Sequence, residues 1–148
     1  MATVLDIDEF YQFLAADALA HGAELHLGGH ALDSQGPLYF QPTVLSGLTQ
    51  AMAIFREETF GPVIAVMPFT DEAHALALAN NTQAGLAGYF FTRDLSRAFR
   101  VAEKLEVGMV GVNTGVISFA NAPFGGVKGR SPLGLRTPAK SHEVDCKN

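Results

Sequence analysis

Apolar side chains recur at intervals of three and four between residues 8 and 20, which is the spacing of one face of a helix. Asp6 or Asp8 can cap the start of this predicted helix, and Gly22 follows its end. The apolar members of the repeat are Phe10, Tyr11, Leu14, Ala15, Ala18 and Leu19. The pattern therefore predicts an amphipathic helix at the start of the chain.

Short strands are predicted next, at residues 23–27 and 42–45, with Gly28-Gly29 breaking the first of them before a loop that contains glycine and proline. Residues 63–69 are almost wholly apolar, which is typical of a strand that is covered on both faces. Such a strand favours a parallel or mixed sheet.

The second half of the chain alternates helical and extended patterns. Thr70 or Asp71 can cap one helix, and Asp94 can cap another that runs through Lys104. Strands are predicted at residues 86–92 and 107–112. The expected buried faces are Ala73, Leu76 and Ala77 in the first helix and Leu95, Ala98, Phe99, Ala102 and Leu105 in the second. The order strand, helix, strand, helix, strand predicts an α/β fold with a mostly parallel sheet and flanking helices.

Composition excludes several classes of function. The net charge is −5 and no two basic residues are adjacent, so a nucleic acid partner is not expected. The apolar runs are far shorter than the roughly 18 residues that a membrane span needs. Cys146 is the single cysteine and cannot form an intrachain disulfide, and there is no secretory signal pattern, so we expect a cytoplasmic protein.

Catalytic and metal motifs are few. No G-x-S-x-G turn, P-loop or G-x-G-x-x-G turn occurs. His21, His26 and His30 are close in sequence, but Gly28-Gly29 separates the last two, so we expect surface histidines and no metal site. The segment from Arg56 to Val63 remains. There a carboxylate could accept hydrogen bonds from ribose hydroxyls, and Phe60 could pack against a flat ring. The alternative is a solvated glutamate pair with Phe60 in the core.

Residues 57–63 have the sequence E-E-T-F-G-P-V. This sequence resembles the signature E-E-x-F-G-P-V of the NAD(P)-dependent aldehyde dehydrogenase superfamily. The chain also carries, in family order, G-A-E-L with Gly28-Gly29, then F-Q-P-T-V-L, G-L-A, R-D-L and A-P-F-G-G-V-K, the last at residues 122–128. The resemblance covers residues 18–128 and implies that residues 1–130 are the C-terminal portion of an aldehyde dehydrogenase catalytic domain. Residues 131–148 form a divergent tail, which we expect to be irregular.

Residues 108–118 are most similar to the succinate-semialdehyde dehydrogenase branch, although Phe119-Ala120-Asn121 departs from its usual N-E-V. The resemblance implies that Glu58 and Phe60 bind the nicotinamide side of NAD or NADP. It also implies that Ser118 and Phe124 line the substrate tunnel. A hydroxyl at position 118 suits a carboxylate tail, because a desolvated carboxylate needs donors. The alternative for Ser118 is a loop hydroxyl that bonds its own backbone.

The parts that perform the family's chemistry lie upstream of the matching region. They are a thiolate that attacks the aldehyde, a glutamate that activates water, and the Rossmann-type domain. Cys146 is no substitute, because it lies in the charged tail without a surrounding motif. We therefore expect a fragment without catalytic residues or metal. It would need another chain to complete the aldehyde site, or it would act as a non-catalytic module that associates with a full-length subunit. Exposed apolar surface at residues 63–69 or 107–112 would favour such association, or a homo-oligomer.

Overall fold

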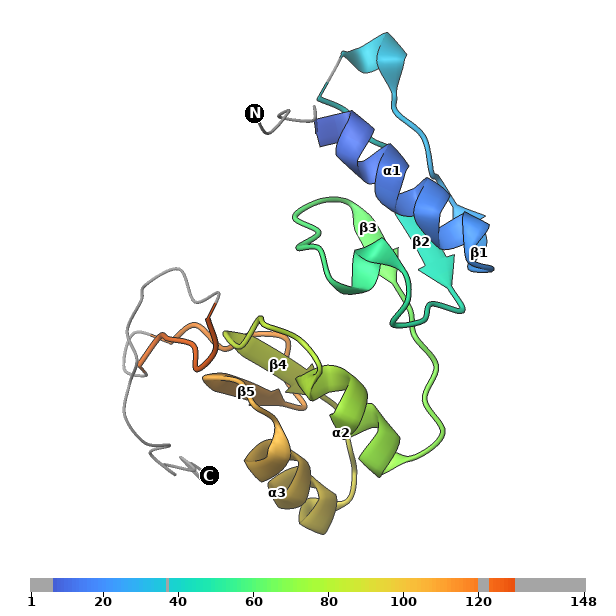
Figure 1. Ribbon diagram of the computed structural model, residues 1–148. Coiled ribbons are helices and arrows are strands. Elements are labelled where there is room, and N and C mark those ends of the chain that lie inside the picture. Colours follow the sequence, from blue (N-terminus) through green and yellow to red (C-terminus); the bar gives the residue numbers. More distant parts are fainter. Residues whose placement is uncertain (1–6, 37, 120–122, 130–148) are drawn as a thin grey trace. The chain divides into compact units, whose positions relative to one another are not determined.

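The computed structural model describes residues 7–36, 38–119 and 123–129 (Figure 1). These form two compact units, Met1–Phe69 and Thr70–Asn148, which are considered separately. Cys146 and the expected tail at residues 131–148 lie outside the described residues, as does Asn121. Each unit combines helices with strands, as the α/β prediction requires.

The first unit contains α1 (Ile7–Ala20) and the strands β1 (Glu24–Leu27), β2 (Thr43–Ser46) and β3 (Val63–Ala65). The strand order is β1-β2-β3, with β1 antiparallel and β3 parallel to β2. A mixed sheet is therefore present. Two single turns of 3-10 helix, Asp33–Gln35 and Ala53–Phe55, lie in the connections.

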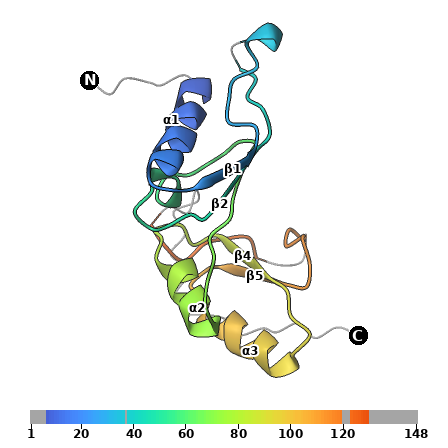
Figure 2. The same ribbon diagram turned by 90° about the vertical axis from the view of Figure 1, so that its right-hand side faces the viewer.

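The core of the first unit lies between α1 and the sheet, which run beside each other in Figures 1 and 2. Leu14 and Ala18 of α1 and Leu45 of β2 are fully buried. The remaining buried members of the cluster are Ala15, Ala23, Leu48, Met52 and Ile54. The predicted helical face is thus the one that packs, except that Leu19 is 41% exposed at the end of α1.

The prediction that residues 63–69 form a strand covered on both faces is wrong. β3 ends at Ala65, and Val63 and Met67 pack against the core while Ile64 and Val66 are exposed. Successive side chains of a strand point to opposite faces, so only one of the two faces meets α1. Apolar composition favoured a strand here but did not reveal which of its faces would be covered.

The second unit contains α2 (Glu72–Asn80), β4 (Ala87–Phe90), α3 (Leu95–Lys104) and β5 (Met109–Val112). β4 and β5 pair in parallel, as the alternating pattern predicted. Both helix caps are confirmed, because Asp71 accepts a hydrogen bond from the backbone N–H of His74 and Asp94 accepts one from that of Arg97, each at 2.8 Å.

The predicted buried faces of these two helices need correction. Val101 of α3 and Leu105, directly after its end, are buried, whereas Leu95 is 73% and Phe99 42% exposed. The apolar arc of this helix is wider than its contact with the strands, so half of the arc remains outside. In α2, Ala73 and Ala77 are exposed and Leu76 is half-buried.

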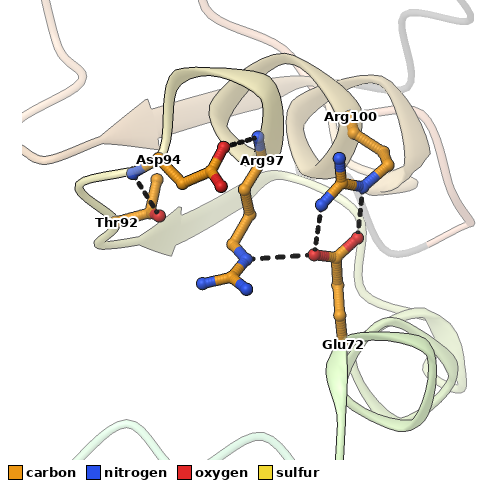
Figure 3. Close-up of polar contacts among 5 residues, drawn as sticks. All are labelled: Glu72, Thr92, Asp94, Arg97 and Arg100. Atoms are coloured by element: carbon orange, nitrogen blue, oxygen red, sulfur yellow. Dashed lines mark hydrogen bonds and ion pairs between the residues drawn. The ribbon is translucent and has the colours of Figure 1, made fainter.

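An ion-pair cluster connects α2 to α3. Glu72 in its first turn contacts two arginines of α3 (Figure 3). Its carboxylate accepts hydrogen bonds from Arg100 Nε at 2.6 Å, Arg100 Nη2 at 2.8 Å and Arg97 Nε at 3.1 Å. Glu72 thus lies on the side of α2 that meets α3, whereas Ala73 and Ala77 are exposed.

The hydrogen bonds from Arg100, joined by those from Arg97, lower the pKa of Glu72 to about 2 from its usual 4.5, although desolvation acts in the opposite sense. Because the folded-state pKa is the lower one, the stabilisation is present above pH 4.5 and is lost as the pH falls toward 2.

We expect the melting temperature of the wild-type chain to fall more steeply between pH 4.5 and pH 2 than that of Glu72→Gln. Glu9→Gln, on the exposed side of α1, should follow the wild type in melts by circular dichroism. Parallel curves for wild type and Glu72→Gln would contradict this role.

Candidate functional site

Glu58 and Phe60 lie in the segment that leads into β3, and both side chains are exposed. Phe60 is 88% exposed, so the alternative that places it in the core is wrong. No described residue bonds the carboxylate of Glu58. An acceptor and a flat aromatic ring are thus both accessible at the amino end of β3. Their roles toward a cofactor stay predictions.

The backbone of this segment is held at its carboxyl end by the sheet. Thr43 N–H of β2 donates to Pro62 O at 2.7 Å, and Val63 N–H donates to Gly61 O at 2.8 Å. On the other side, the Tyr11 hydroxyl of α1 donates to Phe60 O at 2.5 Å. Sequence reasoning missed this role of Tyr11 and treated it only as an apolar member of the helix. A buried tyrosine hydroxyl needs a partner, which is the signal that could have indicated it.

Ser118 and Phe124 lie in the second unit, and both are exposed. Ser118 belongs to the segment that follows β5, and no described residue bonds its hydroxyl. The local turn is instead stabilised by Thr114, which accepts from Val116 N–H and donates to Val116 O, each at 3.2 Å. Among the described residues, the Ser118 hydroxyl therefore makes no hydrogen bond to the backbone of its own loop, contrary to the alternative.

Asn113 fixes the point where the Ser118 segment leaves the sheet. Its side-chain amide donates to Thr92 O and accepts from Thr92 N–H, both at 2.8 Å. Its φ is 55°, in the left-handed region that asparagine tolerates better than most residues. One residue thus extends the β4–β5 pairing and turns the chain. Sequence reasoning included Asn113 in the resemblance at residues 108–118 but did not predict this role.

The loop at residues 123–129, which carries Phe124, packs against two glycines. Gly85 O accepts hydrogen bonds from Gly108 N–H at 2.9 Å and from Val127 N–H at 3.0 Å. A Cβ atom at Gly108 would overlap Gly125 O and would lie 2.7 Å from the carbonyl carbon of Gly125. The three motifs G-L-A, G-M-V-G and P-F-G-G-V-K therefore meet in one backbone arrangement that sets the position of the loop.

Lys128, at the end of the same loop, is tied to α2 and to the segment after α3. Its Nζ donates to Asn80 O at 2.6 Å and forms an ion pair with Glu106 at 2.9 Å. Asn80 in turn donates through Nδ2 to Lys104 O and accepts through Oδ1 from Glu106 N–H. Sequence reasoning placed Lys128 in the A-P-F-G-G-V-K motif but predicted none of these contacts of Lys128 or Asn80, because their partners are distant in sequence.

The two candidate pairs belong to different units, with Glu58 and Phe60 in the first and Ser118 and Phe124 in the second. Their convergence on one site stays a prediction. Among the described residues no three His, Cys, Asp or Glu side chains form a metal-binding group. His21 hydrogen-bonds Asp17 O and His26 hydrogen-bonds the Ser46 hydroxyl. Within the described ranges, no helix has the length and apolarity to cross a membrane.

Comparison with known proteins assigns the chain to a family. Residues 7–143 match the profile of the Aldehyde dehydrogenase family. The chain is 51% identical over 115 residues to the glutarate-semialdehyde dehydrogenase of Pseudomonas aeruginosa. The aligned stretch covers 76% of this chain and 23% of the relative. It is 52% identical over 113 residues to GabD of Escherichia coli, a succinate-semialdehyde dehydrogenase whose name specifies NADP(+), with coverage of 76% and 23%. The chain thus spans about a quarter of the length of these curated relatives.

Solved structures give the same result. The crystal structure of succinate-semialdehyde dehydrogenase from Burkholderia pseudomallei matches with a TM-score of 0.77 and 49% identity over 82% of this chain and 25% of that chain. Betaine aldehyde dehydrogenase from Staphylococcus aureus, in complex with NAD+, matches with a TM-score of 0.76 and 38% identity over 84% of this chain and 25% of that chain. The expected fold class, a partial aldehyde-dehydrogenase-like α/β domain, is therefore confirmed.

Proposed function

Because the chain belongs to the aldehyde dehydrogenase family, we propose that its residues form part of a site that oxidises a semialdehyde to the carboxylic acid with NAD or NADP. The observation that carries this proposal is the identity of about half with relatives named succinate- and glutarate-semialdehyde dehydrogenases. Both substrates carry an aldehyde at one end and a carboxylate at the other. The substrate class is therefore a short aldehyde with an anionic tail.

The exposed groups of the chain fit this chemistry. Glu58 supplies a carboxylate that can accept hydrogen bonds from the hydroxyls of the nicotinamide ribose, and Phe60 supplies a ring for the nicotinamide. Ser118 supplies a hydroxyl donor for the carboxylate tail of the substrate, and Phe124 supplies an apolar wall. When bound, the cofactor accepts the hydride from the substrate.

The 148 residues by themselves are proposed to be inactive. Cys146 is the single cysteine, and its sequence context is a charged tail, so no nucleophile for the aldehyde is evident. Purified chain mixed with succinate semialdehyde and NAD+ or NADP+ should form no reduced cofactor, as followed by its absorbance. Turnover that persists in Cys146→Ser would contradict this expectation.

The cofactor contacts can be tested on the chain alone. We expect weak binding of NADP+, seen as chemical-shift changes in the amides of Glu58 and Phe60 during an NMR titration. Glu58→Gln should weaken this binding about tenfold, because the amide oxygen still accepts but the negative charge that strengthens the hydrogen bonds is lost. Glu57→Gln is the matched control, since Glu57 is an adjacent exposed glutamate. Equal effects of the two substitutions, or shifts confined to other residues, would contradict the assignment of Glu58.

A second function is favoured by one observation, the exposed apolar side chains of the β3 segment. Ile64 and Phe69 are each 62% exposed and Val66 is 48% exposed. Such a surface suits a non-catalytic module that associates with a full-length subunit or with a second copy, in the cytoplasm. Sedimentation at micromolar concentration should then show self-association that Ile64→Lys reduces. A monodisperse monomer at every concentration, alone and with a complete subunit, would exclude this function.

A further inference from the structure

Tyr11 connects α1 to the segment that carries Glu58 and Phe60, although 49 positions separate it from its partner. We propose that Tyr11 is a positioning residue, which fixes the peptide between Phe60 and Gly61 so that the two side chains are presented to a nicotinamide ribonucleotide. This inference rests on the proposed function for the identity of the ligand. The contact itself does not depend on it.

Tyr11 is suited to hold a loop because it is itself immobilised. Its side chain is 5% exposed, and its ring packs against the rings of Phe40 at 5.5 Å and Phe10 at 5.8 Å between centroids. The adjacent turn of α1 carries Leu14, which is fully buried. Movement of the tyrosine hydroxyl would therefore require repacking of the core, and the hydroxyl acts as a fixed donor to Phe60 O.

Gly61 makes the close approach of the ring possible. A Cβ atom at this position would overlap the hydroxyl end of Tyr11 and would lie 2.6 Å from Cε2. The backbone of the segment thus lies directly on the tyrosine ring. Because Tyr11 cannot retreat, a side chain at position 61 would push the segment away from α1.

The consequence for Phe60 is an exposed ring on a fixed backbone. Thr43 N–H of the sheet bonds the carbonyl of Pro62, and Tyr11 of α1 bonds the carbonyl of Phe60. The backbone is therefore hydrogen-bonded on both sides of Gly61. A ligand that stacks on Phe60 then meets a backbone that is already ordered, which reduces the entropy lost on binding. Among the described residues, no other donor bonds the carbonyl of Phe60.

Tyr11→Phe tests the hydrogen bond alone, because the ring and its packing remain. We expect the NMR order parameters of the Phe60 and Gly61 amides to fall from about 0.85 to below about 0.6, while those of β2 stay unchanged. NADP+ binding should weaken about fivefold, as for the loss of one neutral hydrogen bond. Tyr39→Phe is the control, since Tyr39 is 53% exposed.

A second pair of variants addresses the packing. Gly61→Ala should displace the segment in the wild-type background but have little further effect in Tyr11→Leu, where the shorter side chain leaves room for the methyl group. Unchanged order parameters in Tyr11→Phe, or additive effects of Gly61→Ala and Tyr11→Leu, would overturn the proposal. If the order parameters fall and NADP+ perturbs neither Glu58 nor Phe60 in the wild type, the positioning role holds and the cofactor assignment fails.

Discussion

Gly108→Ala is expected to detach the loop at residues 123–129 and to destabilise the second unit by about 3 kcal/mol, the upper end of typical overpacking costs. The new methyl group would overlap Gly125 O and would lie 2.7 Å from the carbonyl carbon of Gly125 and 2.9 Å from Gly126 Cα. All three atoms belong to the backbone, so no side chain can rotate away. The loop must then give up the bond from Val127 N–H to Gly85 O.

Hydrogen exchange of the Val127 amide measures this detachment directly. A loss of about 3 kcal/mol corresponds to a rise of about a hundredfold in the exchange rate. Gly125→Ala is the matched control, because it adds a methyl group to the other partner of the contact, where no heavy atom lies within 4 Å. If Gly108→Ala leaves Val127 as protected as in Gly125→Ala, the glycine contact does not hold the loop.

Local signals along the sequence were sufficient to locate the helices. α2 and α3 begin directly after Asp71 and Asp94, and α1 ends two residues before Gly22, whose φ is 94°. Caps and left-handed glycines act within a few residues of where they stand, so they can be interpreted without knowledge of the fold. The parallel pairing of β4 with β5 also followed from the order of the elements, whereas β3, expected in the same alternating series, pairs with β2 in a separate sheet.

Strand ends and exposed faces were predicted less well, because they depend on neighbours that a sequence does not reveal. The apolar run at residues 63–69 yields a strand of three residues, and Leu95 and Phe99 lie outside the packed side of α3. In both cases the residue types are apolar and the covering surface is narrower than the apolar stretch. Ala73 and Ala77 of α2 are likewise apolar and exposed.

The candidate site likewise contains some residues that the sequence identified and others that it did not. Motifs identified Glu58, Phe60, Ser118 and Phe124, all of which are exposed. The residues that hold the surrounding backbone were not identified, since each acts over a long sequence distance. Tyr11 bonds Phe60, Lys128 bonds Asn80 and Asn113 bonds Thr92. Side chains that support a site are visible only once the fold brings their partners together.

Gly28→Ala is expected to cost the first unit about 4 kcal/mol, because two unfavourable effects coincide. The φ of Gly28 is 75°, a conformation that costs an L-residue about 1–2 kcal/mol. A Cβ atom there would also overlap Pro42 O and would lie 2.6 Å from Thr43 Oγ1 and 2.9 Å from the carbonyl carbon of Pro42. Thr43 is 1% exposed, and its hydroxyl already accepts from Gly29 N–H and donates to Gln41 O. It cannot move aside without breaking these bonds.

Gly29→Ala separates the two effects. Its φ of 89° carries a similar backbone strain, but the nearest atom to its Cβ would be the end of the Leu25 side chain, at 3.0 Å, and Leu25 is 41% exposed and free to adjust. Gly29→Ala should therefore cost about 1–2 kcal/mol, from the backbone alone. Urea denaturation of the two variants should differ by at least about 2 kcal/mol, the contribution of the clash with Pro42. Equal values would show that the approach of Gly28 to β2 is not tight.

The same displacement should reach the candidate cofactor segment. Thr43 N–H donates to Pro62 O, so a shift of Thr43 in Gly28→Ala moves the residues that precede β3. We expect chemical-shift changes at Gly61 and Phe60 in Gly28→Ala and none there in Gly29→Ala, because only the former displaces the backbone of β2. Shifts confined to residues 25–30 in both variants would mean that the Gly28-Gly29 turn and the Glu58 segment are mechanically independent.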